Sequence, residues 1–115
     1  MMLVSALALL SCAPDVQNAA PVLETSTFAD GVTVEIPTVG VIVEVTASDP
    51  DGDPMQFRWA IDGIGVQGED ETNVSSTTSS YALAGEHLDG ATLSCTITDG
   101  LEDTAISWPL VYIGA

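Results

Sequence analysis

Basic side chains are almost absent from this chain of 115 residues, which has one Lys or Arg against 17 Asp and Glu and a formal net charge of −16. The single basic residue is Arg58. Because binding to nucleic-acid phosphates requires clusters of Lys and Arg, this balance argues against nucleic acid as a partner. It also disfavours electrostatic docking onto anionic membrane surfaces. The hydrophobic content of 46% still allows a folded core, so the charge does not indicate a disordered chain.

Residues that commonly carry catalysis or bind transition metals are also scarce. The chain has one His, His87, and two Cys. A Ser-His-Asp site would have to use His87, which lies in the turn-like segment GEHLDG without a strained nucleophile elbow nearby. One His and one Cys on an apolar strand face do not make a zinc site. We therefore predict that the protein is not an enzyme.

The first eleven residues, MMLVSALALLS, are uncharged and almost wholly apolar, and Cys12 follows them. This run is shorter than the ~20 apolar residues that span a bilayer, and it is typical of the apolar region of a secretory signal. The segment Leu9-Leu10-Ser11-Cys12 resembles the lipobox of bacterial lipoproteins. That resemblance implies cleavage before Cys12 and a membrane anchor of acyl chains on Cys12. An ordinary signal peptide and a buried N-terminal strand are the alternatives.

The signal divides the chain into a signal peptide (1–11), a lipidated Cys with a short tether (12–20) and one domain (21–115). Ala13 stands where many enterobacterial inner-membrane lipoproteins have Asp. By this resemblance we expect a lipid-anchored protein of the bacterial cell envelope, on the outer membrane or the cell surface. If Cys12 is not acylated, a disulfide to Cys95 is the alternative.

The rest of the chain alternates between apolar and polar residues, with Gly, Asp and Pro between the alternating runs. A period of two is typical of β-strands. The runs cover residues 32–36, 39–47, 55–62, 75–83, 91–98 and 106–113. Six or seven short strands predict an antiparallel β-sandwich, because a single sheet would leave a face of Val, Ile and Trp in water.

Residues on the apolar side of these runs are predicted to form the core. They are Val43, Val45, Phe57, Trp59, Leu93, Cys95, Ile97 and Trp108. Cys95 is interpreted as a small buried hydrophobic residue and not as a nucleophile. Pro109 lies inside the last run and cannot donate a hydrogen bond, so we expect that strand to be bulged or at an edge there.

Two segments carry a resemblance to a family of domains. ASDPDGDP at 47–54, followed by FRW at 57–59, and ATLSCTITDG at 91–100 resemble the PKD-type and cadherin-like repeats of bacterial immunoglobulin-like domains. The resemblance covers about residues 20–113. It implies an all-β, immunoglobulin-like sandwich of about seven strands that serves as an adhesive, spacer or ligand-presenting module.

Four acidic residues form a candidate metal site. Asp49, Asp51 and Asp53 are spaced two residues apart in a turn-rich segment, and Asp99 lies in a loop at the same end of such a sandwich. Carboxylates in this spacing can surround Ca²⁺, although the EF-hand positions for Gly and Glu are not matched. Cadherin-like relatives use comparable Asp clusters between repeats. The alternative is that Asp, Pro and Gly only make a tight, solvated turn.

Two functions therefore remain open. The leading hypothesis is a non-enzymatic, lipid-anchored immunoglobulin-like module of the cell envelope, which binds an unidentified protein or glycan or acts as a spacer. The alternative is a calcium-dependent cell-adhesion module with an Asp-rich ion-binding loop.

Overall fold

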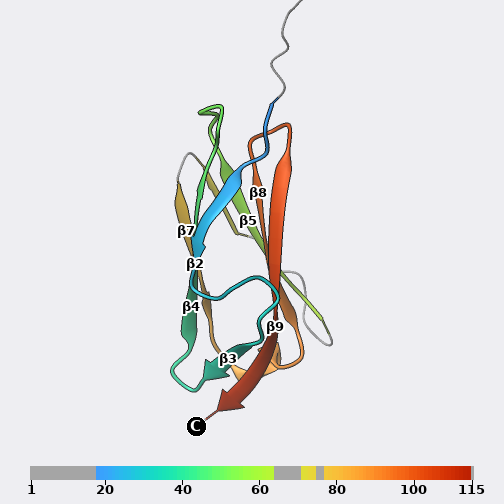
Figure 1. Ribbon diagram of the computed structural model, residues 1–115. Helices are drawn as coiled ribbons and strands as arrows, with labels where there is room; N and C mark the ends of the chain where they lie inside the picture. The colour runs from blue at the N-terminus through green and yellow to red at the C-terminus, as the bar shows by residue number, and fades with distance from the viewer. Residues whose placement is uncertain (1–17, 64–70, 75–76, 115) are drawn as a thin grey trace, which may run out of the picture.

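The computed structural model describes residues 18–63, 71–74 and 77–114, and these form two packed β-sheets (Figure 1). The first sheet has the order β2-β4-β7, with β2 (Val22–Ser26), β4 (Val41–Ser48) and β7 (Thr78–Leu83). The second sheet has the order β3-β9-β8-β5-β6, with β3 (Val34–Pro37), β9 (Asp103–Gly114), β8 (Thr92–Thr98), β5 (Gln56–Asp62) and β6 (Glu71–Val74). A short 3₁₀ helix, η1 (Glu86–Leu88), joins β7 to β8. The signal segment and Cys12 lie outside the described residues.

The predicted all-β, immunoglobulin-like sandwich is confirmed. Strands β2, β4 and β7 form one layer, and β5, β8 and β9 form the centre of the other, which is the division found in immunoglobulin domains. Every described strand pair is antiparallel except one, β3 with β9. Within the part of the chain that the structure describes, no helix is long and apolar enough to cross a membrane.

The parallel pair arises because the first stretch of the sandwich changes sheets. β2 pairs with β4, and the chain then crosses to the other layer, where β3 pairs with β9. The crossing is fixed at Ser107 of β9, whose N–H donates to Asp30 Oδ1 over 2.9 Å and whose carbonyl accepts from Gly31 N–H over 2.8 Å. Gly31 has a φ of 86°, a conformation that strongly favours glycine.

Pro109 lies in β9 at a position where its lack of an N–H donor breaks no hydrogen bond to β8. Leu110 N–H donates to Ala91 O on the β8 side, so the neighbouring Pro109 nitrogen faces the opposite side of the strand. There β3 begins only opposite Leu110. The Pro109 nitrogen thus lies just before the pairing with β3 begins, and β9 is an inner strand between β3 and β8, not an edge strand.

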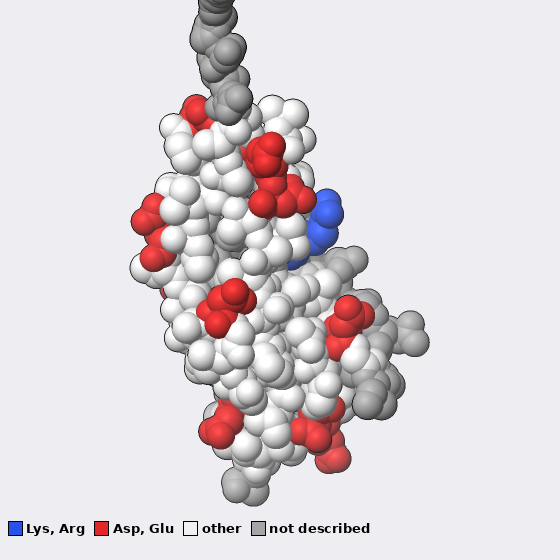
Figure 2. Space-filling model, turned by 45° about the vertical axis from the view of Figure 1, so that its right-hand side comes forward, with Lys and Arg blue, Asp and Glu red and all other residues white. Residues whose placement is uncertain are grey.

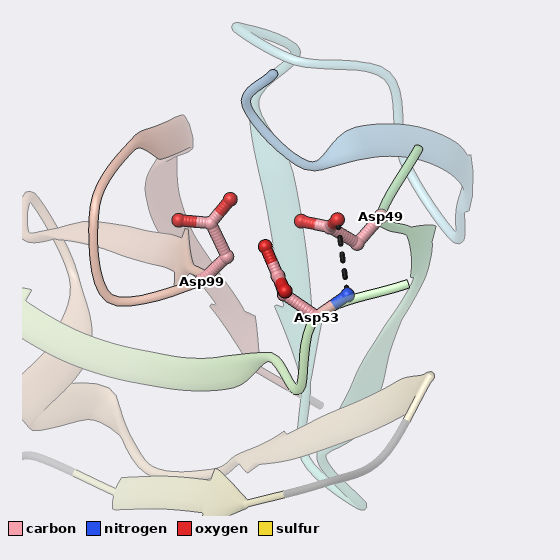
Figure 3. Close-up of side chains that lie close together, drawn as sticks. All are labelled: Asp49, Asp53 and Asp99. Atoms are coloured by element: carbon pink, nitrogen blue, oxygen red, sulfur yellow. Dashed lines mark hydrogen bonds between the residues drawn. The ribbon is translucent and has the colours of Figure 1, made fainter. Parts of the chain in front are cut away.

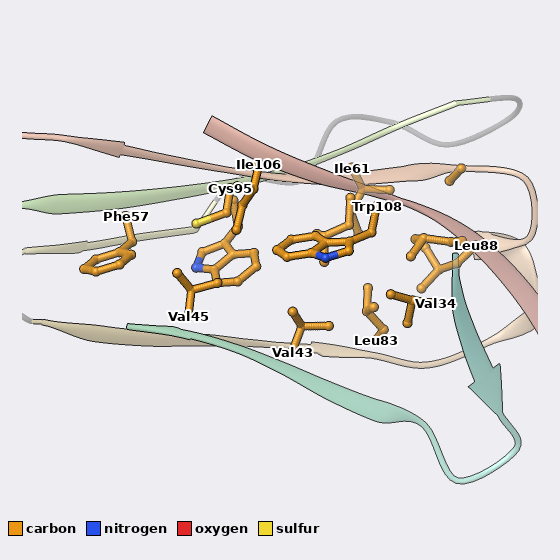
Figure 4. Packing of buried hydrophobic residues seen from close by; sticks show 14 of the residues in the cluster. Val34, Val43, Val45, Phe57, Ile61, Leu83, Leu88, Cys95, Ile106 and Trp108 are labelled. Atoms are coloured by element: carbon orange, nitrogen blue, oxygen red, sulfur yellow. The ribbon is translucent and has the colours of Figure 1, made fainter. Parts of the chain in front are cut away.

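The core lies between the two sheets and is built around stacked aromatic rings. All eight residues predicted to be buried have 0% relative exposure. Figure 4 shows Val43, Val45 and Leu83 of one sheet pointing toward Phe57 and Trp108 of the other. The Trp59 ring stacks on Tyr81 at 5.6 Å and on Trp108 at 6.2 Å between ring centroids.

Both tryptophan N–H groups find acceptors inside the fold. Trp59 Nε1 donates to Ser79 Oγ over 2.8 Å, and Trp108 Nε1 donates to Phe28 O over 3.0 Å. Because a buried polar group without a partner is costly, these bonds let both indoles be fully buried.

The sandwich has two distinct ends. The first, which we name the tether pole, comprises residues 18–21, the β4–β5 loop and the β8–β9 loop (Figure 1). The second, the distal pole, comprises the β3–β4 turn and the start of β4. Val22 pairs with Ser48 at one end of β4, whereas Val41 pairs with Leu83 at the other. The two poles are therefore separated by the full length of β4, about 23 Å.

Candidate functional site

The β4–β5 loop begins with a β-turn over residues 49–52, which the backbone and the side chain of Asp49 stabilise. Gly52 N–H donates to Asp49 O over 3.0 Å, with Pro50 second and Gly52 fourth in the turn, the positions that these residues favour. Asp49 Oδ1 also accepts from the N–H groups of Asp51 over 2.8 Å and of Asp53 over 3.2 Å. The Asp49 side chain thus holds the loop backbone in place.

The β8–β9 loop is built in the same way around Asp99. Its Oδ1 accepts hydrogen bonds from Leu101 N–H over 2.9 Å and from Glu102 N–H over 2.8 Å. Gly100 has a φ of 96°, which lets the chain reverse direction directly after Asp99. The carboxylate is therefore anchored at the tip of the hairpin.

These two loops bring three carboxylates together at the tether pole. Asp49, Asp53 and Asp99 each place one oxygen within 4.8 Å of the others, and Figure 3 shows the three side chains pointing toward one another. Two oxygens that bind one Ca²⁺ at about 2.4 Å can be at most about 5 Å apart, so this spacing suits a shared ion. Asp49 Oδ2 is buried and accepts no hydrogen bond from the described residues.

The charges at this pole act differently on two of the acids. Burial raises the pKa of Asp53, and the charges of Asp49, Asp51 and Asp99 raise it further. Hydrogen bonds from Glu102 N–H, Asn18 and Leu101 N–H lower the pKa of Asp99 to about 2. Asp99 is therefore ionised at any physiological pH, whereas the surroundings of Asp53 disfavour its ionised form.

Acidic side chains are spread over the surface beyond this site as well. Figure 2 shows several separate acidic groups on one face and a single basic side chain, which is Arg58. No described acid of the tether pole has a basic side chain within its hydrogen-bonding shell.

Asp51, the fourth predicted ligand, is not among the three residues that converge. Its side chain is exposed, and Oδ2 accepts a hydrogen bond from Ala19 N–H over 2.8 Å. Asn18, which sequence analysis placed in the tether, donates from Nδ2 to Asp99 Oδ2 over 2.8 Å. No local pattern marks this contact, because Asn18 and Asp99 are 81 residues apart.

The structure also places the two side chains that were considered as reactive groups, His87 and Cys95. His87 is exposed on η1, away from the three carboxylates. Cys95 is a free thiol in the core, and burial raises its pKa to about 12. Because the thiolate is the reactive form, Cys95 acts here as a packing residue.

No family model matches the chain, and no curated protein matches it. The assignment of a function therefore depends on the sequence motifs and on the geometry of the described residues.

Proposed function

We propose that this chain is a non-enzymatic, lipid-anchored immunoglobulin-like module of the bacterial cell envelope, with a binding or spacer role at the outer membrane or cell surface. The single observation that carries the proposal is the difference between the two ends of the sandwich. The chain enters it at the tether pole, where Leu101 is 77% exposed, and the distal pole carries the exposed Val39 (92%) and Ile42 (61%) beside an apolar groove. This is the arrangement of a module held at one end and presenting a surface at the other.

The distal pole offers a place for a protein or glycan partner. A shallow groove of about 400 Å³ is lined by residues 39–42 and 82–84, all of them apolar or Gly. None of the 17 acids lines it. A partner that covers this groove would bury apolar surface and no charged lining side chain, so desolvation of the groove would favour binding.

The anchor is tested by expression of the full chain with Cys12→Ser. We expect wild type in the membrane fraction with an acylated N-terminal Cys12 by mass spectrometry, and the variant unprocessed at this site and lacking the acyl mass. Ser5→Ala is the matched control, because it changes a small residue of the same apolar run outside the lipobox-like segment. A mature N-terminus at another residue, without acyl groups, would refute the anchor.

A second candidate function is calcium binding at the tether pole, as in an ion-dependent adhesion module. The specific observation is the convergence of Asp49, Asp53 and Asp99, together with the unpartnered Oδ2 of Asp49. Ca²⁺ would screen the mutual repulsion of the carboxylates and link the β4–β5 loop to the β8–β9 loop. Mg²⁺ would substitute poorly, because it demands a tighter octahedron and keeps its water.

Calorimetry and thermal melting with Ca²⁺ or EDTA test this candidate. At a hundredfold excess over Kd, binding to the folded state alone adds about 2.7 kcal/mol to stability. Asp49→Asn keeps an Oδ1 acceptor for the turn but removes the charge, so we expect the calcium-dependent shift to be lost. Asp62→Asn, at the far end of β5, is the control of equal charge change. Identical melting of wild type in Ca²⁺ and EDTA, with no binding heat, would leave the loop as a plain turn.

A further inference from the structure

Strand β7 lies at the end of its three-stranded sheet and has one open edge among the described residues. It pairs with β4 alone, in an uninterrupted antiparallel register. Ala47 N–H donates to Thr77 O over 2.9 Å, so by alternation the odd-numbered residues of β7 direct their backbone groups toward β4. Ser80 and Ala82 direct their N–H and C=O groups away from the sheet, where no described residue pairs with them.

The other described edge strands are protected against pairing with a further strand, whereas β7 is not. β2, β3 and β6 have four or five residues and contain a glutamate each; β2 also has a bulge, and β3 ends in Pro37. Short length, charge, proline and bulges are the usual features that protect a sheet edge. β7, with the sequence TSSYAL, has six residues, no charge, no proline and no bulge. Its edge is therefore a template for an added strand.

The negative charge of the chain selects which kind of strand fits this edge. Two copies would bring two net charges of −16 together, which opposes pairing of β7 with itself. Glu44 of β4 lies directly opposite Ser80, and both side chains are exposed on the outer face of the sheet. A Lys or Arg beside Ser80 on an added strand would be two strand spacings, roughly 10 Å, from the Glu44 backbone, with only a small side chain between them.

The apolar groove of the distal pole continues this edge. Ala82 lines the groove and also directs its backbone groups outward, and Ile42, directly opposite Ala82, is exposed on the same face. On an added antiparallel strand, the residue beside Ala82 comes two positions before the residue beside Ser80 and lies on the same face. An apolar side chain at that position would lie against Ala82 and Ile42.

We propose that β7 binds an extended segment of a cationic partner protein as an added antiparallel strand, with an apolar residue beside Ala82 and, two residues later, a Lys or Arg beside Ser80. The open edge supplies backbone hydrogen bonds, and Glu44 and the groove select the side chains. This inference rests on the binding role in the proposed function, for which it names the partner, and it does not depend on the lipid anchor.

The first test titrates the full chain, as isolated, with the end-blocked peptide TLTKTT and follows backbone amides by NMR. We expect the signals of Ser80 and Ala82 to shift, and the peptide with Glu in place of Lys to bind about fivefold to tenfold more weakly. Methylation of the peptide nitrogens of Leu and Lys, which face β7, should weaken binding roughly fivefold for each blocked hydrogen bond. Methylation of the two Thr nitrogens that flank Lys is the matched control, because these face solvent.

The second test exchanges the charge at the edge. Ser80→Lys should weaken binding of TLTKTT roughly fivefold and strengthen binding of the Glu peptide, since an exposed side chain at this position lies beside the charged residue of the peptide. Thr92→Lys, at an exposed position of β8 in the other sheet, is the control of equal charge change. Glu44→Gln should reduce the preference for Lys over Glu.

Several outcomes would overturn the proposed edge binding. They are equal affinity for the two peptides, equal effects of the two methylation patterns, and absence of binding at millimolar peptide. Self-association in sedimentation that Ser80→Lys abolishes would also overturn it, because a second copy would then occupy the edge. Mass spectrometry of Cys12 in the same preparation tests the anchor separately: an acylated chain that does not bind refutes the edge alone, whereas peptide binding by a chain without acyl groups refutes the anchor alone.

Discussion

Replacement of Trp59 by Ala is the sharpest test of the core. The Trp59 side chain has 0% relative exposure, stacks on Tyr81 and Trp108, and donates a hydrogen bond to Ser79. Trp→Ala substitutions in cores cost about 3–5 kcal/mol, and loss of the Ser79 bond adds about 1 kcal/mol. The sum of about 5 kcal/mol equals the whole stability of many domains of this size. We therefore expect Trp59→Ala to be largely unfolded at 25 °C.

Urea denaturation followed by Trp108 fluorescence and by circular dichroism measures this loss. Trp59→Phe is the matched control, because it keeps a ring in the stack and loses the N–H donor, for an expected cost of about 1–2 kcal/mol. A Trp59→Ala variant that loses less than about 1 kcal/mol would refute the placement of this ring between the sheets, and so would equal losses in the two variants.

Three predictions concern the acids of the tether pole. The raised pKa of Asp53 means that its ionisation destabilises the folded state. The protonated side chain contributes fully to stability below the unfolded pKa near 4, and this contribution is lost as pH rises through the folded pKa. Urea midpoints should thus show Asp53→Asn more stable than wild type at pH 7 and equal to it near pH 3, and a lower midpoint at pH 7 would contradict this. The pKa of Asp99 is lowered to about 2, so its contribution is present above about pH 4 and lost between about pH 4 and 2. Asp99→Asn should be destabilised at pH 7 and match wild type by about pH 2, and a difference that persists there would argue against the hydrogen bonds as the cause. If Ca²⁺ binds, protons compete for Asp53, so the calcium-dependent rise in melting temperature should shrink between pH 7 and pH 4, and a constant rise would place the ion elsewhere.

The strands that could be predicted from the sequence are those with one buried and one exposed face. Strands β4, β5 and β8 follow the predicted alternation closely, because each lies inside the sandwich with its apolar side on the core. β2 could not be predicted: it has no fully buried residue and no regular alternation. The parallel pairing of β3 with β9 depends on contacts between distant segments, which alternation within one segment does not encode.

For the candidate site, the sequence placed the acids at one pole but did not predict which of their side chains converge. Turn chemistry and the layout of an immunoglobulin-like sandwich place Asp49, Asp53 and Asp99 at one end. The direction of each carboxylate depends on backbone donors within its loop. Asp51 is turned instead toward Ala19, a residue that sequence analysis assigned to a free tether. Contacts across many residues decide such details, and spacing alone carries no signal for them.

The turn interpretation and the ion interpretation of the acidic segment are separated by Asp53. Asp49 Oδ1 and Asp99 Oδ1 accept backbone N–H groups, so the loops themselves account for these two oxygens. The carboxylate of Asp53 accepts no hydrogen bond from the described residues, and its charge opposes folding. A plain turn would be more stable with Asn at this position, whereas an ion site needs the carboxylate. Clusters of surface carboxylates are common without an ion, so the effect of Asp53→Asn on Ca²⁺ binding decides between the two interpretations.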